Sequence, residues 1–241
     1  MNTTAHHADD ALPLAQLKQI SQPTVADRVF DELHKNILSL ALPPRTKMSE
    51  TDVAKTMGVS RQPVREAFKR LAKLGFLIVR PQSSTTVSLI SEEAVLRARY
   101  VRTALEVQTC RTAAAEIDDA GLAALASLID AQRHAITEKD RHKFHMLDDR
   151  FHREICIRAD VHYVWDLIHE SKGHMDRIRM LSLSTTSQQT ALQEHILMFD
   201  AISKGDGDTC ATILTQHLNR ITGLIDDIKA TNHAWFTKVT L

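Results

Sequence analysis

The chain has 241 residues, with 43% hydrophobic and 25% charged side chains and only 7 glycines. This composition is typical of a soluble, helix-rich globular protein. No apolar stretch reaches the roughly 18 residues that a membrane-spanning helix needs, so we expect no membrane partner. The net charge is zero, but residues 24–90 hold 11 Lys and Arg against 6 Asp and Glu, and residues 91–241 hold 18 against 22. A basic front and an acidic back indicate different partners for the two parts.

The amino-terminal residues 1–22 are polar and mixed, and we expect them to form a disordered tail. They contain no basic segment followed by an apolar one, which argues against a signal peptide. The three cysteines, Cys110, Cys156 and Cys210, form no C-x-x-C pair. They suit reduced thiols, which favours a cytoplasmic location.

Residues 23–90 are predicted to form one small domain that begins with three helices. Apolar residues recur at helical spacing from Val25 to Leu40, and a pair of prolines then stops that helix. Ser49, with an aspartate three residues later, resembles a capping box and opens a short second helix. Gly58 ends the second helix, and Ser60 is expected to cap the third, which runs to about residue 74.

Two β-prone runs, at 76–80 and 85–89, flank a turn at 81–84 and predict a hairpin. Three helices followed by a hairpin make a winged helix-turn-helix, a fold that binds DNA. The third helix turns an apolar stripe to the core and has polar and basic residues at its start and along the other side. These candidate DNA-binding residues are Ser60, Arg61, Gln62, Arg65 and Lys69.

The start of a helix in the major groove reaches base edges, while flanking cations neutralise phosphates. Arginine suits a bidentate contact with guanine, and serine and glutamine suit phosphate or base edges. The alternative is a solvated basic helix face, which the preceding helix and the following hairpin make less favourable. We therefore predict that this helix reads DNA.

The segment MSETDVAKTMGVSRQPVREAFKRLAKLGFLIVRP resembles the winged-helix domain of the GntR family of bacterial transcription regulators. The most specific part runs from Gly58 to Ala67, and the resemblance covers about residues 24–90. It implies that Ser60, Arg61, Gln62 and Arg65 face an operator. The sequence departs from the family at Thr51, where a basic residue is frequent, and in a turn at 81–84 without glycine.

Residues 91–231 are predicted to form an all-α domain of six helices, and residues 232–241 a carboxy-terminal tail. The complete chain is therefore expected to be mostly α. The helices are placed at 91–117, 120–138, 140–158, 161–183, 187–204 and 207–230. Glycines and aspartates mark some of the boundaries between these helices, but not all of them.

Candidate metal ligands lie on three of these helices. In the helix at 140–158, Asp148 lies roughly 55° and His152 roughly 95° from the centre of the apolar stripe. Because the two residues are four positions apart, their side chains point in the same direction along the edge of the core. His145, at roughly 115°, is a weaker candidate. His195 and His217 each lie within the apolar stripe of another helix.

A single buried histidine is more often a hydrogen-bonded core residue than a ligand. Three inward histidines with an inward carboxylate support one another, because this donor set suits Zn²⁺, Ni²⁺ or another divalent transition metal. Cys156, one turn after His152, fits better as a small core residue.

Arg102 lies within the apolar stripe of the helix at 91–117. A buried cation needs an anion, and spacing leaves two choices open: Glu106 one turn on, or the carboxylate of a ligand. His174, Arg177 and Arg179 could also approach a pocket, but periodicity does not decide for them, and a solvated face is the favoured interpretation.

The segments RYVRTALEVQTCRTAA, LDDRFHREI and EHILMFDAISKGDGDTCATILTQHL resemble the effector-binding FCD domain of the FadR-like branch of the same regulators. This resemblance covers about residues 91–230. It implies a dimeric helical bundle in which Asp148, His152, His195 and His217 bind a metal and Arg102 meets an effector carboxylate.

These observations predict a DNA-binding transcription regulator rather than an enzyme, with the family implying a repressor of a catabolic operon. A homodimer would bind an inverted-repeat operator and leave it when a small carboxylate or sugar acid binds at the metal. Two alternatives stay open. The metal is purely structural, or, less favoured, the protein is a metal-dependent hydrolase fused to a DNA-binding domain.

Overall fold

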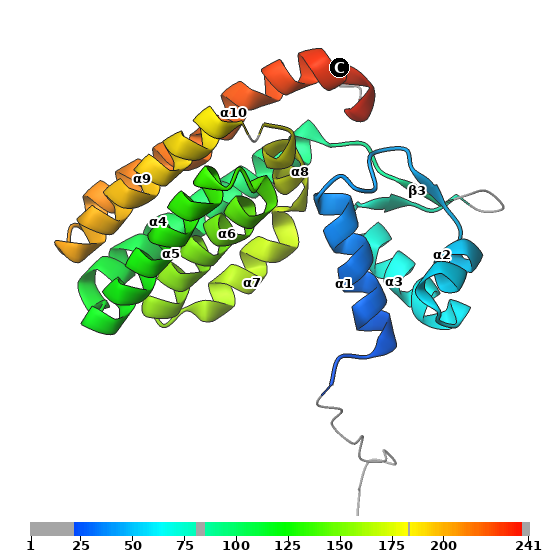
Figure 1. Cartoon of the computed structure of the whole chain (residues 1–241), viewed down its shortest axis with the longest axis horizontal. Helices are drawn as coiled ribbons and strands as arrows, with labels where there is room; N and C mark the ends of the chain where they lie inside the picture. Colours follow the sequence, from blue (N-terminus) through cyan, green and yellow to red (C-terminus); the bar gives the residue numbers. More distant parts are fainter. Residues whose placement is uncertain (1–21, 81–84, 183, 238–241) are drawn as a thin grey trace, which may run out of the picture.

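The computed structural model describes residues 22–80, 85–182 and 184–237 and confirms a mostly helical fold with two parts (Figure 1). The expected tail, apart from residue 22, and the wing turn at 81–84 lie outside the described residues. Within the described part of the chain, no helix is both long and apolar enough to cross a membrane.

Three helices form most of the front domain: α1 (Val25–Leu38), α2 (Glu50–Met57) and α3 (Arg61–Lys73). Thr24 caps α1 in a reciprocal capping box with Asp27, and Ser49 accepts a hydrogen bond from the Asp52 backbone at the start of α2. Gly58 ends α2 with a φ of 65°, in the left-handed region that glycine adopts without a steric penalty. The apolar faces of the three helices meet in one core, which includes Val29, Ile37, Val64, Phe68 and Leu71.

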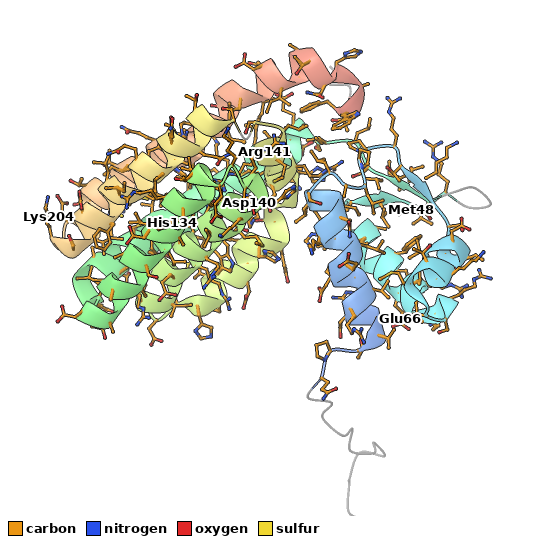
Figure 2. All side chains as sticks on the ribbon, viewed as in Figure 1. Met48, Glu66, His134, Asp140, Arg141 and Lys204 are labelled. Atoms are coloured by element: carbon orange, nitrogen blue, oxygen red, sulfur yellow. The ribbon has the colours of Figure 1, made fainter. Side chains whose placement is uncertain are left out.

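The wing belongs to a three-stranded sheet rather than to a two-stranded hairpin. β2 (Leu77–Ile78) and β3 (Thr85–Val87) pair antiparallel as predicted, and β1 (Lys47–Met48) pairs with the other edge of β3. The order is β1-β3-β2. Figure 2 marks Met48 in this sheet. β1 was not predicted because a strand of two residues is too short to show an alternating pattern in the sequence.

The back domain contains seven α-helices within the described residues, not the six predicted. They are α4 (Glu92–Glu116), α5 (Asp119–Thr137), α6 (Arg141–Arg158), α7 (His162–Ser171), α8 (Gly173–Ser182), α9 (Thr185–Ser203) and α10 (Gly207–Asn232). α10 packs along α4 and α9, and α5 packs on α6 and α9. Asp140, which caps α6, lies at the α5–α6 junction marked in Figure 2.

The prediction of one helix over 161–183 is wrong because the chain bends at Lys172, between α7 and α8. The Lys172 ammonium is buried and pairs with Asp149 at 2.7 Å and Asp176 at 2.6 Å. Gly173 then opens α8 against the front domain, where a β-carbon at this residue would come within 2.2 Å of the Phe76 ring. The bend therefore lets α8 reach the front domain.

The described part of the predicted carboxy-terminal tail packs on the link between the domains. α10 runs to Asn232, a short 3-10 helix follows (His233–Trp235), and Phe236 is buried. The Ile90 backbone N–H donates a 2.7 Å hydrogen bond to the carbonyl of Trp235, and Thr237 N–H donates to the Ile90 carbonyl at 3.0 Å. Residues 232–237 thus belong to the folded body.

Candidate functional site

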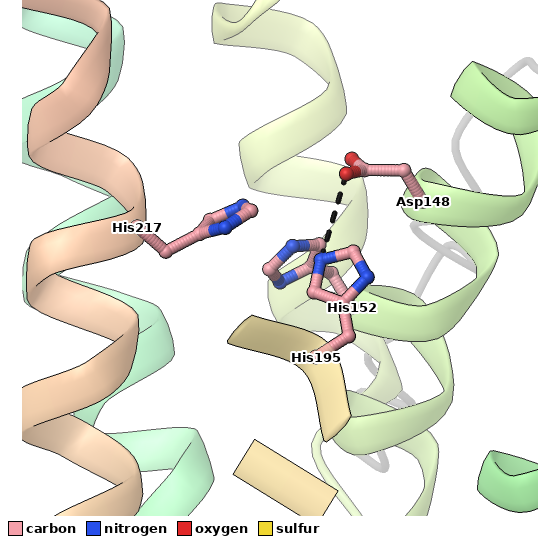
Figure 3. Close-up of side chains that lie close together, drawn as sticks. All are labelled: Asp148, His152, His195 and His217. Atoms are coloured by element: carbon pink, nitrogen blue, oxygen red, sulfur yellow. Dashed lines mark ion pairs between the residues drawn. The ribbon is translucent and has the colours of Figure 1, made fainter. Parts of the chain in front are cut away.

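Four potential metal ligands converge inside the back domain. Asp148 and His152 come from α6, His195 from α9 and His217 from α10, and all four are buried. One ligand atom of each lies within 4.8 Å of the others. Figure 3 shows the side chains pointing toward a common point between the three helices. We call these four residues the ligand cluster.

Hydrogen bonds behind two of the imidazoles fix their orientation. His195 Nδ1 lies 2.7 Å from Gln132 Oε1, while the Gln132 amide nitrogen donates to the Leu147 carbonyl at 3.2 Å. That donation makes Oε1 the acceptor, so His195 Nδ1 carries the proton and Nε2 keeps its lone pair. His217 Nδ1 likewise lies 2.7 Å from Glu194 Oε2. Such partners set the tautomer of metal-binding histidines.

The third imidazole is backed by Glu106 and, behind it, by Arg102. His152 Nδ1 lies 2.8 Å from Glu106 Oε2, and Arg102 donates to the same carboxylate at 2.6 and 3.3 Å. Arg102 is completely buried. The structure thus shows the pair with Glu106, one of the two partners left open by spacing, and places Arg102 behind the ligand cluster. Its role toward an effector stays a prediction.

Electrostatics favour the protonation states that bind metals. Burial lowers the pKa of His195 to about 3, and burial, together with the two other imidazoles, holds the pKa of His217 well below its ordinary value. Burial raises the pKa of Asp148, but Arg179 and the imidazoles more than offset it, so that this pKa is well below normal. Neutral imidazoles and an ionised carboxylate are the forms that coordinate a metal.

The donor set passes a chemical test for a transition-metal site. Nε2 of His152 and Nε2 of His195 are buried and have no hydrogen-bond partner within the described part of the chain. An unpartnered buried polar atom is costly, and a metal would satisfy both nitrogens. Three nitrogen donors and one oxygen donor suit Zn²⁺, Ni²⁺ and their neighbours equally. His145 groups with Asp148 and Asp149 instead.

A cleft with a volume of about 50 Å³ opens beside the ligand cluster. Asp148 and His217 line it, together with Arg179 and Arg220. Arg179 donates to both oxygens of Asp148, at 2.6 and 2.9 Å, and its NH2 lies 3.4 Å from His217 Nε2. The cleft therefore combines the candidate metal ligands with two guanidinium groups.

The interpretation of His174, Arg177 and Arg179 as a solvated face is wrong. His174 and Arg177 are buried, and the Arg179 side chain is only 14% exposed. The first two contact the front domain and the third faces the cleft. Periodicity gave no signal because α8 is covered on nearly all sides, so its sequence has no single apolar face.

The candidate DNA-binding residues lie together at the exposed side of α3. Ser60, Arg61, Gln62, Arg65 and Lys69 are all solvent-exposed. Ser60 occupies the N-cap position but makes no side-chain hydrogen bond to the helix, contrary to the expected cap. Its hydroxyl thus remains available to an outside partner.

Glu50, at the start of α2, was not singled out by the sequence, yet it holds both arginines. Its carboxylate accepts from Arg61 at 3.3 Å and from Arg65 at 3.1 to 3.2 Å. The contact joins residues 15 positions apart in sequence, so helical spacing could not reveal it. Glu50 therefore aligns the two guanidinium groups along α3.

Comparisons with known proteins agree with this geometry. Residues 25–87 match the family model of bacterial regulatory proteins of the gntR family, and residues 99–220, half of the chain, match the model of the FCD domain. The chain belongs to the GntR family of transcriptional regulators. It therefore binds operator DNA, and the prediction of a regulator rather than an enzyme is confirmed.

Relatives cover nearly the complete chain. The HTH-type transcriptional repressor RspR of Escherichia coli (strain K12) is 35% identical over 219 residues, 90% of this chain and 96% of that protein. The gluconate operon transcriptional repressor of Bacillus subtilis (strain 168) is 25% identical, covering 88% and 89%. The solved structure of E. coli McbR/YncC has the same fold, with a TM-score of 0.75 at 20% identity, over 86% of this chain and 99% of that one.

Proposed function

We propose that this GntR-family regulator is a repressor of a catabolic operon. It leaves its operator when a small carboxylate or sugar acid binds at a divalent metal held by Asp148, His152, His195 and His217. The observation that carries the proposal is the convergence of these four side chains beside a cleft that also presents Arg179 and Arg220. A metal with open coordination positions and nearby guanidinium groups suits a carboxylate.

Two relatives support the physiological part of the proposal. One is named a gluconate operon transcriptional repressor, and another, 28% identical over 85% of this chain, is named a probable D-xylose utilization operon transcriptional repressor. Both names describe control of carbohydrate use in those organisms. A sugar acid or related small acid is therefore the class of effector to test first.

On the DNA side, we propose that a homodimer places two α3 helices in successive major grooves of an inverted repeat. In each copy, Arg61, Gln62 and Arg65 would meet base edges and Ser60 and Lys69 phosphates. The exposed positions of all five side chains on one side of α3 support this assignment. An effector that changes the spacing of the two α3 helices would weaken binding.

Helix α8 provides a physical connection between the cleft and the DNA-binding domain. Arg179 and Met175 line the cleft, whereas His174 stacks on the Phe76 ring with centroids 5.3 Å apart. The Arg177 NH2 donates to the Ser88 carbonyl at 2.7 Å. A shift of α8 caused by a ligand at Arg179 would therefore move the contact with the front domain, which is how binding at one site changes affinity at another.

The test is an operator-binding titration. A DNA site selected from random-sequence DNA by the purified protein is labelled, and its affinity is measured by fluorescence anisotropy with metal-free, zinc-loaded and nickel-loaded protein. Each form is titrated with gluconate and other small acids. We expect one acid to weaken operator binding in a metal-loaded form only, and the His195→Ala variant to lose this response.

Two results would contradict the proposal. If every acid that binds the protein leaves operator affinity unchanged, the regulator does not respond through this cleft. If an acid releases the operator equally well after the metal is removed, the metal is structural and the acid is recognised by the protein alone.

A further inference from the structure

The most informative contact in the cleft is the pair between Arg179 and Asp148. The guanidinium meets both carboxylate oxygens, at 2.6 and 2.9 Å, in the bidentate geometry that makes such pairs strong. The same NH2 group that bonds Asp148 Oδ1 lies 3.4 Å from Nε2 of His217. One positive charge of the protein thus contacts two members of the ligand cluster.

This cation compensates a carboxylate that would otherwise be isolated. Asp148 is 1% exposed, and a buried carboxylate without a partner is strongly destabilising. The other near group, His195 Nε2 at 3.5 Å from Asp148 Oδ1, belongs to an imidazole whose Nδ1 already holds the proton. Arg179 is therefore the cation that pairs with the buried Asp148 carboxylate when no metal is bound.

We infer that Arg179 is a built-in counter-cation that competes with the divalent metal for Asp148, and that, once released, it becomes the receptor for the carboxylate of the effector. The inference rests on the proposed function, because it assigns the residue that connects metal binding to effector binding at the same site. The Arg179 side chain can reach both Asp148 and a ligand in the cleft, because it is long, lies on the cleft wall and is 14% exposed.

Charge balance gives the reason for the exchange. Around the cleft, Arg179 pairs with Asp148 and Arg220 pairs with Glu194 at 2.8 Å, so the four charges cancel. A divalent cation at Asp148 leaves the Arg179 guanidinium without its anion and adds positive charge to a partly buried space. An incoming carboxylate offsets part of this excess positive charge. Small anionic acids, rather than neutral sugars, are therefore the ligand class that this arrangement selects.

The inference makes two predictions of opposite sign for one substitution. In Arg179→Gln the metal no longer displaces a cation, so we expect its affinity for Zn²⁺ to increase about tenfold or more. We expect acetate to increase the zinc affinity of the parent, because the coupling between the two ligands is reciprocal. The same variant lacks the carboxylate receptor, so acetate should leave its zinc affinity unchanged. If Arg179 merely supported the fold, its replacement would decrease the zinc affinity.

The experiment measures the zinc dissociation constant of the metal-free full-length protein by competition with a chromophoric chelator, with and without acetate. Arg133→Gln is the matched control, because Arg133 is an exposed arginine of α5 that pairs with Asp130 and lies outside the cleft lining. It should show the parent's zinc affinity in the absence of acetate. Arg179→Lys keeps the charge but not the bidentate contact and should bind zinc with intermediate affinity.

The outcomes separate this inference from the proposed function. If the parent binds zinc but Arg179→Gln binds it equally or more weakly, the counter-cation role is wrong while the metal site stands. If the parent binds no transition metal, the proposed function and this inference both fail. If metal-free Arg179→Gln does not fold, the decision rests on Arg179→Lys, where unchanged or weaker zinc affinity than in the parent would overturn the inference.

Discussion

Arg177 of α8 and Ser88 of the segment after β3 are joined by a hydrogen bond of 2.7 Å between the guanidinium NH2 and the backbone carbonyl. Arg177 is fully buried, and burial lowers its pKa to about 10. Two residues further along α8, Arg179 lies on the cleft wall. Less than one helical turn therefore separates the contact with the DNA-binding domain from the candidate effector site.

We expect Arg177→Met to uncouple the effector from the operator. The apolar side chain keeps much of the volume but removes the bond to Ser88, at a cost of about 1–3 kcal/mol for the unpaired carbonyl. Operator affinity should then change little when effector is added, while effector affinity, measured by calorimetry without DNA, stays near that of the parent. The measurement is the ratio of operator dissociation constants with and without saturating effector.

The matched control for this coupling is Arg133→Met on α5. Arg133 is exposed, and its ion pair among the described residues is a local one, with Asp130 at 2.6 Å. Its variant should retain the parent's ratio. An unchanged ratio in Arg177→Met would show that the contact with Ser88 carries no part of the response.

Gln132 should control metal affinity without touching the metal. Its Oε1 fixes the tautomer of His195, so Gln132→Ala should weaken zinc binding by about 10–100-fold, as is typical for loss of such a partner. The measurement is chelator competition on the full-length protein. Gln189→Ala, at an exposed position of α9, is the control and should bind zinc like the parent. Equal affinities for the two variants would refute the role of Gln132.

Arg65 and Lys69 should affect operator binding differently. If Arg65 reads a base, Arg65→Ala should weaken binding to the selected operator by about 1–3 kcal/mol and reduce discrimination against sites altered at one base pair. If Lys69 contacts phosphate, Lys69→Ala should weaken binding to all sequences alike. It should also reduce the slope of the logarithm of the affinity against the logarithm of the salt concentration by about one. Anisotropy titrations at several salt concentrations distinguish the two, and uniform weakening by both variants would contradict base recognition by Arg65.

Acid should destabilise the metal-free protein through two histidines between the domains, the buried His174 and the half-buried His34. Burial, together with the charge of Arg177, lowers the pKa of His174 to about 4, and burial does the same for His34. Because these folded-state values lie below the unfolded value of 6.5, the unfolded state binds more protons as the pH falls from about 6.5 to 4. Stability should therefore decrease across this window.

The size of this effect can be measured on one residue. For His174, 7% exposed, the loss between pH 7 and pH 5 should be about 2 kcal/mol. Urea unfolding of metal-free parent and His174→Gln at both pH values gives the difference. The variant should lose about 2 kcal/mol less than the parent over this interval. Equal losses would show that His174 does not titrate as its burial implies.

Local patterns in the sequence were sufficient for much of the molecule. Helical spacing and caps placed α1 to α6, α9 and α10 to within a few residues, because an amphipathic helix repeats its apolar residues along one face. The same periodicity put Asp148, His152, His195 and His217 on inward faces, and in the structure these side chains meet. Whether they bind a metal stays a prediction.

The tertiary structure decided the features that depend on partners distant in sequence. β1 forms because β3 pairs with it. The chain bends at Lys172 because the Lys172 ammonium pairs with Asp149 and Asp176 and because Gly173 packs on the Phe76 ring. Arg179 was placed in the cleft by Asp148, 31 residues away. Periodicity shows which face of a helix is apolar, but a helix covered on nearly all sides has no such face. Its polar residues are placed by the charges and hydrogen-bonding groups of neighbouring helices.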